Sequence, residues 1–334
     1  MNTNQPQVSI VCVTYNHEEF IEEAINGFLM QKTNFPVEVI IHDDASTDNT
    51  TKVIQEYHTK YPEIIKPIIQ TQNQFSIRQF DFFRDILKKA EGKYIALCEG
   101  DDYWTDSLKL QKQVDFMELN PEFSICFHKV KILKNNQLIE DNITNVPSKI
   151  TSITDLVKGN YIHTPSCVFR NRQDSIIGAN FIHSPLGDYY IHMMNALHGK
   201  IFHIDEDMAV YRIHPHSMWS SQSSLYHETK TLISYCCILL DLDKNFDFIR
   251  KDIESHIACR SQIIFNRHQD FIDDLAKEPI LIFKNIIRIN MMELQKIKRN
   301  PFYRIYQSWY KFNRKIKKLF RIQGSLNSVL ALLI

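Results

Sequence analysis

Short, mostly apolar runs that stop at polar residues recur along the first hundred positions of the chain. Residues 8–13, 37–41, 64–69 and 94–98 are such runs, a pattern typical of strands that are covered on both faces. Between them, apolar residues recur at helical spacing, as in residues 20–29,. This regular alternation of strands and helices predicts an α/β fold in which helices flank a mostly parallel sheet.

Farther along the chain, the pattern predicts more strands and then helices alone. We expect two closing strands, at residues 201–204 and 208–213,. From residue 223 onward the strand signals fade, and helical spacing returns in four segments: 232–242, 249–265, 280–297 and 303–320. The sequence therefore predicts one α/β domain at residues 1–222 and a C-terminal helical extension at residues 223–334.

Polar side chains follow three of the predicted strands. They are Thr14, Tyr15 and Asn16 after the first strand, Asp43 and Asp44 after the second, and Glu99, Asp101 and Asp102 after the fourth. We expect Asn16 also to cap the helix that follows it. Ligands of open α/β sheets collect beyond the carboxyl ends of the strands, and carboxylates there suit a metal–phosphate complex. We therefore expect these strand ends to form one site.

Composition places the chain among ordinary globular proteins, with 44% hydrophobic and 23% charged residues,. The net charge of zero conceals an asymmetry, because residues 296–321 hold ten Lys or Arg and no Asp or Glu. Because the net charge is zero and this segment is basic, the rest of the chain is acidic. An acidic main domain argues against nucleic acid as a partner of the main site. In residues 311–321 cations alternate with apolar side chains, a pattern that fits either a helix on an anionic membrane or an ordinary solvated helix.

The cysteines and the first residues of the chain both favour a cytoplasmic location. The seven cysteines include no CxxC pair, and their number and spacing favour reduced, buried thiols. The first residues lack the basic and apolar regions of a secretory signal, and no apolar stretch is long enough to cross a membrane,. We expect a cytoplasmic protein that can bind peripherally to the inner face of the plasma membrane.

Five segments, in the same order along the chain, resemble the family 2 glycosyltransferases, which are inverting nucleotide-sugar enzymes of the GT-A fold. They are residues 8–16, 43–48, 99–102, 187–188 and 211–214. The resemblance covers about two thirds of the chain, and the segment at residues 99–102 stands where the family has its DxD-type motif. No helix beyond residue 223 takes part in it.

The resemblance implies a role for each matching residue. Contacts with the nucleotide sugar are implied for Thr14, Tyr15, Asn16, Asp43, Asp44, Asp101 and Arg212. Tyr15 and Asp44 would contact the nucleoside, with Asp44 accepting from a pyrimidine ring nitrogen. Asp102 and His214 would hold Mn²⁺ or Mg²⁺, and Asp188 would be the catalytic base, although the family usually has Glu-Asp where this chain has Gly187-Asp188.

The implied activity is single-displacement transfer of a sugar, from a nucleotide diphosphate sugar that we expect to be UDP-linked. The acceptor would be a hydroxyl of a surface polysaccharide or a lipid-linked oligosaccharide. Two other functions stay open: a sugar-phosphate nucleotidyltransferase, although the chain lacks a Gly-rich phosphate loop, and a non-catalytic nucleotide-sugar binding protein. Asp101, Asp102 and Asp188 could instead be simple helix caps.

Overall fold

The apolar runs form the strands of one curled sheet. The computed structural model describes residues 5–78, 80–172, 176–215 and 222–266. The strands are β1 (Val8–Thr14), β2 (Val37–Asp43), β3 (Ile65–Ile69), β4 (Tyr94–Leu97), β5 (Tyr103–Trp104), β6 (Phe123–Lys134), β7 (Gln137–Glu140), β8 (Ile150–Thr151), β9 (Val168–Arg170) and β10 (Lys200–Ile213). Their order is β3-β2-β1-β4-β9-β6-β10-β5, with β7 beside β6 and β8 beside β10.

The long ladders of this sheet are parallel. β1 pairs in parallel with β2 on one side and with β4 on the other, and β6 pairs in parallel with β10. The short β9 lies between the two parallel parts and joins them, since it pairs with β4 on one side and with β6 on the other. Both of these pairings are antiparallel. The mostly parallel sheet predicted from the sequence is therefore present, and the polar ends of β1, β2 and β4 meet at one edge.

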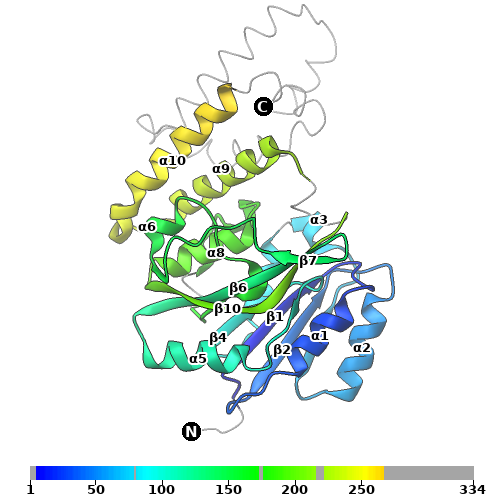
Figure 1. Ribbon diagram of the computed structural model, residues 1–334. Coiled ribbons are helices and arrows are strands. Elements are labelled where there is room, and N and C mark those ends of the chain that lie inside the picture. The colour runs from blue at the N-terminus through cyan, green and yellow to red at the C-terminus, as the bar shows by residue number, and fades with distance from the viewer. Residues whose placement is uncertain (1–4, 79, 173–175, 216–221, 267–334) are drawn as a thin grey trace, which may run out of the picture.

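Helices cover both faces of the sheet (Figure 1). They are α1 (Ile21–Leu29), α2 (Thr50–Lys60), α3 (Gln74–Arg78), α4 (Asp81–Leu87), α5 (Lys109–Leu119), α6 (Ile153–Leu156), α8 (Gly187–Ala196), α9 (Ser224–Asp241) and α10 (Asp247–Asn266). Single 3₁₀ turns lie at Thr164–Ser166, Phe181–His183 and Lys244–Phe246.

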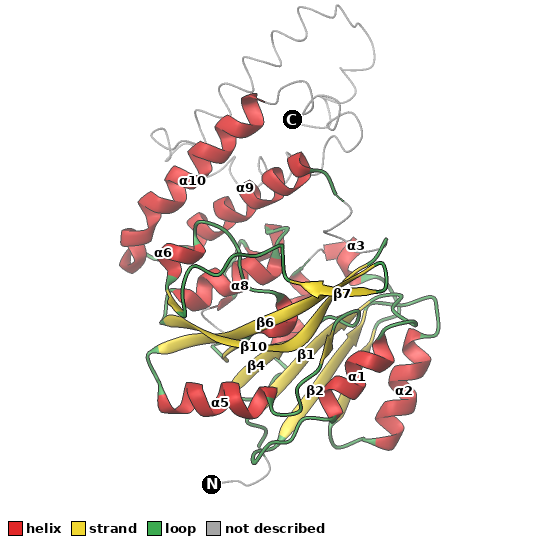
Figure 2. Ribbon diagram, in the orientation of Figure 1, coloured by secondary structure: helices red, strands yellow, loops and turns green. Residues whose placement is uncertain are grey.

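Successive side chains of β1 point to opposite faces and enter two different cores. Ile10 belongs to the core that holds the apolar residues of α1, α2 and α5. Val11 belongs to the core that holds those of α4, α6 and α8. The sheet is thus the middle layer between two sets of helices (Figure 2), which is why its strands read as continuous apolar runs.

The helical pattern beyond residue 223 is confirmed for its first two segments, which form α9 and α10. Their buried residues, among them Cys237, Ile238 and Ile249, share one core with α8. The segments predicted at residues 280–297 and 303–320, with the basic stretch, lie outside the described residues. Among the helices that the structure describes, none combines the length and apolar character needed to cross a membrane.

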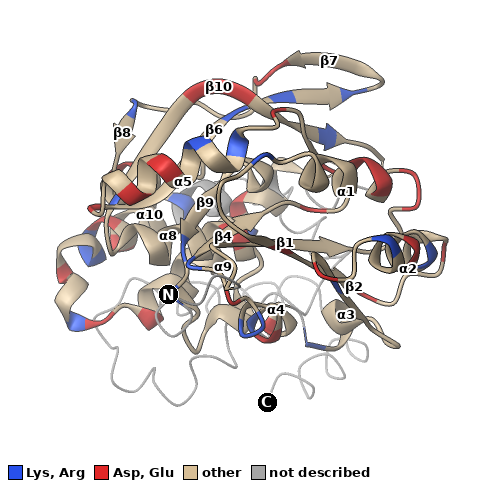
Figure 3. Cartoon of the chain, turned by 90° about the horizontal axis from the view of Figure 1, so that it is seen from below, with Lys and Arg blue, Asp and Glu red and all other residues tan. Residues whose placement is uncertain are grey.

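Two details of the sequence interpretation are wrong. Asn16 does not cap α1, because that helix begins at Ile21 and Phe20 precedes it. The two closing strands are one, β10. Between Ile204 and Ala209 its pairing with β6 continues only through Asp207, with a register shift on each side, and residues 205 and 206 have no partner in β6. In this stretch Asp205 and Asp207 form ion pairs with Lys129 and Lys131 of β6, and it is the acidic segment of β10 in Figure 3.

Candidate active site at the strand ends

The three polar strand ends that the sequence predicts to lie together are fastened to one another by backbone hydrogen bonds. Asp44 N–H donates to Thr14 O at 3.0 Å, which joins the end of β2 to that of β1. Gly100 N–H donates to Val13 O at 2.9 Å, which joins the turn after β4 to β1. A Cβ at Gly100 would lie 2.6 Å from Thr14 Oγ1, so the turn can approach β1 this closely only without a side chain.

The loop after β1 is held by the loop after β2. Asn16 has a φ of +54°; its Oδ1 accepts from Thr47 N–H at 2.8 Å, and its own N–H donates to Ser46 Oγ at 2.8 Å. His17 N–H donates to Thr50 Oγ1 at 2.8 Å. Asn16 therefore shapes the floor of the site, and Tyr15 beside it is 43% exposed and accessible to a ligand.

The two carboxylates after β2 point to different partners. Asp43 is fully buried and accepts from Ser46 Oγ at 2.5 Å and from the Thr51 hydroxyl, so it organises the loop before α2. Asp44 accepts from Gln74 N–H at 2.6 Å and from Phe75 N–H at 3.0 Å. Asp44 thus connects the expected nucleoside region to α3.

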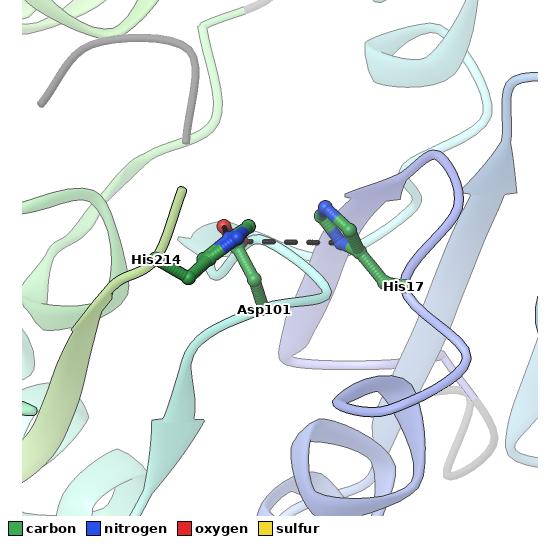
Figure 4. Close-up of side chains that lie close together, drawn as sticks. All are labelled: His17, Asp101 and His214. Carbon is green, nitrogen blue, oxygen red and sulfur yellow. Dashed lines mark hydrogen bonds and ion pairs between the residues drawn. The ribbon is translucent and has the colours of Figure 1, made fainter. Parts of the chain in front are cut away.

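Asp101 and Asp102, in the turn after β4, are held by the end of β10. Asp102 Oδ1 accepts from Arg212 N–H at 2.8 Å. Asp101 Oδ2 lies 3.0 Å from His214 Nε2, and Asp101 Oδ1 lies 4.0 Å from His17 Nδ1. Figure 4 shows the Asp101 carboxylate between the two imidazoles.

This turn collects more negative charge than its surroundings neutralise. Burial, together with the charges of Asp101 and Glu99, raises the pKa of Asp102 well above its ordinary value. Burial, Asp101 and Asp188 raise the pKa of Glu99 to about 8. For Asp101, burial is outweighed by the hydrogen bond with His214 and the charge of His17, so its pKa is lowered. The turn would be stabilised by a cation.

The residues present fit a divalent cation. Among the described residues, the buried polar atoms without a hydrogen-bond partner include Thr14 Oγ1, His17 Nδ1, Asp101 Oδ1 and Asp102 Oδ2 at these strand ends. Buried polar atoms are nearly always paired. Two groups of side chains could each hold a cation, because the ligand atoms within each group all lie within 4.8 Å of one another. One group is His17, Asp101 and His214, and the other is Glu99, Asp101 and Asp102. Asp101 is common to both groups.

Arg212 is already engaged by the protein. Its Nε donates to Asp101 O at 2.7 Å, its Nη2 donates to Glu23 at 2.6 Å, and its guanidinium lies 4.6 Å from the Phe20 ring centre. The chain therefore uses Arg212 to fasten the acidic turn to β10 and α1.

Asp188 is the second residue of α8 and accepts from Asn160 Nδ2 at 3.1 Å. It lines an apolar pocket together with Glu99, Phe181 and Gly187. The residue expected to be the base thus lies beside the acidic turn, as the raised pKa of Glu99 also indicates.

His17 is the residue of this site that the sequence interpretation leaves out. It directly follows Thr14-Tyr15-Asn16, so its place at a strand end was a usable signal. The pattern of apolar and polar residues does not predict the conformation of the loop after β1, which turns the imidazole of His17 back toward Asp101.

Comparison with known proteins identifies the family of this chain. Residues 9–181 match the family model described as glycosyl transferase family 2. An uncharacterized protein of Mycobacterium tuberculosis, Rv1520, is 45% identical over 217 residues, which make up 64% of this chain and 61% of that protein.

Two solved structures share the fold. Residues 1–349 of S. aureus TarS in complex with UDP-GlcNAc are 19% identical, with a TM-score of 0.55 over 79% of this chain and 73% of that one. The mannosyltransferase PcManGT from Pyrobaculum calidifontis, in complex with GDP-Man and Mn²⁺, is 14% identical, with a TM-score of 0.53 over 96% and 88%. The predicted fold class is confirmed.

Proposed function

Because the chain belongs to glycosyl transferase family 2, we propose that it transfers a sugar from a nucleotide diphosphate sugar to an acceptor hydroxyl with inversion. The observation that carries this proposal is the meeting of Asp44, Asp101, Asp102 and Asp188 around the ends of β1, β2 and β4. A nucleoside contact, a cation site and a base are the parts that such a reaction requires.

In the proposed mechanism, Tyr15 and Asp44 bind the nucleoside, and Thr14, Asn16 and Asp43 shape the loops beneath it. Asp188 accepts the proton of the acceptor hydroxyl as that oxygen attacks C1 of the sugar, and the bond from C1 to the diphosphate breaks. Asp101, Asp102 and His214 would hold Mn²⁺ or Mg²⁺, which neutralises charge on the leaving diphosphate. Arg212 positions Asp101 and Asp102 through the hydrogen bonds described above.

We propose UDP as the nucleotide, since a carboxylate can accept from the ring N–H of uracil. TarS has been solved with UDP-GlcNAc and PcManGT with GDP-Man and Mn²⁺, so the fold admits more than one base. A panel of UDP-, dTDP- and GDP-sugars tests this proposal by the rise in melting temperature that each produces. A larger rise with a GDP-sugar would contradict it.

The acceptor we propose is a surface polysaccharide or a lipid-linked oligosaccharide. The support is the charge of residues 296–321, with ten basic and no acidic side chains. Such a segment would bring a cytoplasmic enzyme to the anionic inner face of the plasma membrane. The liposome experiment described in the Discussion tests the membrane contact.

Replacement of the proposed base tests the reaction itself. We expect Asp188→Asn to lower sugar transfer about 10²- to 10⁴-fold, the range of general-base catalysis, with UDP affinity unchanged. The asparagine keeps an oxygen that can accept from Asn160. Release of UDP from UDP-sugars in the presence of a panel of saccharide and lipid-linked acceptors measures transfer, and calorimetry measures UDP binding.

Two results would contradict this mechanism. Transfer within threefold of wild type in Asp188→Asn would remove Asp188 as the base. Binding of UDP-sugars by the wild-type chain, without transfer to any acceptor of a broad panel, would favour a binding protein over an enzyme.

A further inference from the structure

Three segments far apart in the chain place ligand atoms around one point. His17 comes from the loop after β1, Asp101 from the turn after β4, and His214 directly follows β10. The Asp101 carboxylate lies 3.0 Å from His214 Nε2 through one oxygen and 4.0 Å from His17 Nδ1 through the other. Adjacent ligands bound to one cation at about 2.1 Å lie about 3 Å apart, and opposite ligands about 4.2 Å apart. The spacing matches one coordination sphere (Figure 4).

The imidazole of His17 is fixed in place by several contacts. Its backbone N–H donates to Thr50 Oγ1 at 2.8 Å. Its ring meets the ring of Phe20 at 6.1 Å between centroids, and Phe20 in turn packs against His214 at 4.9 Å. A Cβ on Gly100 would come within 3.1 Å of His17 Nδ1, so the glycine leaves the space that this nitrogen faces.

The surroundings of His17 Nδ1 indicate a ligand. His17 Nδ1 and Asp101 Oδ1 face each other, and neither has a hydrogen-bond partner among the described residues. Beside them, Asp102 Oδ2 also has none, on a side chain that is 1% exposed, and it belongs to the second group of atoms around Asp101. A cation between His17 and Asp101 would satisfy atoms that otherwise lack partners.

We propose that His17 is a further protein ligand of the catalytic cation, beside Asp101, Asp102 and His214, and that the two imidazoles make the site prefer Mn²⁺, Co²⁺ or Zn²⁺ over Mg²⁺. Imidazole nitrogen suits these transition metals, whereas Mg²⁺ prefers oxygen ligands. This inference deepens the proposed function, because it rests on a cation acting at that site.

Metal binding without nucleotide or acceptor tests the proposal separately from catalysis. In this test, the full-length chain is treated with EDTA and then titrated with Mn²⁺, and electron paramagnetic resonance measures the bound Mn²⁺. Competition with the bound Mn²⁺ measures the affinity for Mg²⁺. In wild type we expect one site that prefers Mn²⁺. In His17→Ala the Mn²⁺ affinity should fall about tenfold or more, while Mg²⁺ affinity changes less than threefold, so that the selectivity collapses.

A matched control and a direct observation guard against a folding defect. His198→Ala removes an exposed histidine just before the opposite end of β10 and should bind Mn²⁺ as wild type does. In wild-type chain with ¹⁵N-labelled histidine, Zn²⁺ should shift the Nδ1 resonance of His17, which needs no variant at all.

Three outcomes would overturn the inference. They are an unshifted His17 Nδ1 resonance in the Zn²⁺ complex, wild-type Mn²⁺ affinity in His17→Ala, and a His17→Ala chain that loses UDP affinity alone, which would make His17 a diphosphate contact. Each would leave the proposed sugar transfer standing. Conversely, a wild-type chain that binds Mn²⁺ through His17 but transfers no sugar would refute the proposed function and leave the ligand assignment intact.

Discussion

Asp44 has a structural role at the edge of the candidate site besides its proposed contact with the nucleoside. Its two carboxylate oxygens accept from the backbone N–H groups of Gln74 and Phe75 at the start of α3. Each oxygen keeps a second lone pair that can accept from a nucleobase. The residue would therefore couple the shape of the loop before α3 to the proposed binding of the nucleoside.

We expect Asp44→Ala to lower stability and UDP affinity together. At a position that is 5% exposed, the change leaves two backbone donors without their acceptor, at a cost of about 1 to 3 kcal/mol. UDP should bind about tenfold more weakly or worse, because a hydrogen bond to the base is lost. Urea unfolding and calorimetry measure the two effects.

Asp44→Asn is the matched control, since its amide keeps one acceptor oxygen. Its stability should lie between those of wild type and Asp44→Ala. If Asp44→Ala bound UDP as tightly as wild type, Asp44 would have only its structural task.

At this scale, sequence reasoning predicts which strand ends lie together but not every contact between them. Acidic residues after apolar runs were enough to select Asp44 and Asp101, because parallel strands bring their ends to one edge. Nothing in the spacing showed that Asp43 would turn inward to Ser46 and Thr51, or that His17 would reach Asp101. Those contacts depend on loop conformations such as the positive φ of Asn16.

The helix α8 is almost completely enclosed. Of its ten residues only Asp188 is not buried. The helix carries the proposed base at its first turn and, one turn later, a fully buried His192. The enclosure fixes Asp188 at the end of a rigid support, which a general base requires.

His192 should make the protein less stable in acid. Burial lowers its pKa to about 4, although Asp188 acts in the opposite direction. The pKa of His192 in the folded state lies below the ordinary 6.5. The free energy of unfolding therefore keeps its full value with respect to this group above pH 6.5 and decreases as the pH falls toward 4. The loss is about 3 kcal/mol in the free energy of unfolding.

A comparison of urea unfolding between pH 7.5 and 4.5 in wild type and His192→Gln measures this effect. Because the other groups titrate alike in both proteins, the wild type should lose more stability than the variant over this interval. Parallel pH profiles would show that His192 does not carry the dependence.

The elements also show where periodicity misleads. Residues 205–207 are polar and exposed, so they read as a break between two strands, yet β10 continues through them. The pairing of Asp207 with β6 and the ion pairs of Asp205 with Lys129 and of Asp207 with Lys131 hold the strand where apolar burial does not. Only the partner strand reveals this continuity, and a single-strand pattern lacks that information.

On the scale of the whole molecule, α9 and α10 are not an independent layer. Buried residues of α9 and α10 share a core with α4, α6 and α8. The helical pattern was visible in the sequence, but its place in the core of the α/β domain was not, because a pattern shows which face is apolar and not what covers it. The division of the chain into two domains at residue 222 therefore stays a prediction.

The basic stretch is testable only on the full chain. We expect the wild type to float with liposomes that contain anionic lipid, since each Lys or Arg near such a surface contributes about 1 kcal/mol. Deletion of residues 296–334 should abolish flotation, and neutral liposomes serve as the control. Equal recovery of both forms with anionic liposomes would remove the membrane contact.

The proposed cation site has a consequence for the protein as it is synthesised. His17 leaves the ribosome about 200 residues before His214, and the two rings meet at Asp101 only when β10 has paired with β6. A nascent chain that lacks the residues after β10 therefore lacks His214, one of the four proposed ligands. Full cation affinity would appear only when the sheet is complete, so metal binding would stabilise the finished fold by mass action and leave earlier intermediates unassisted.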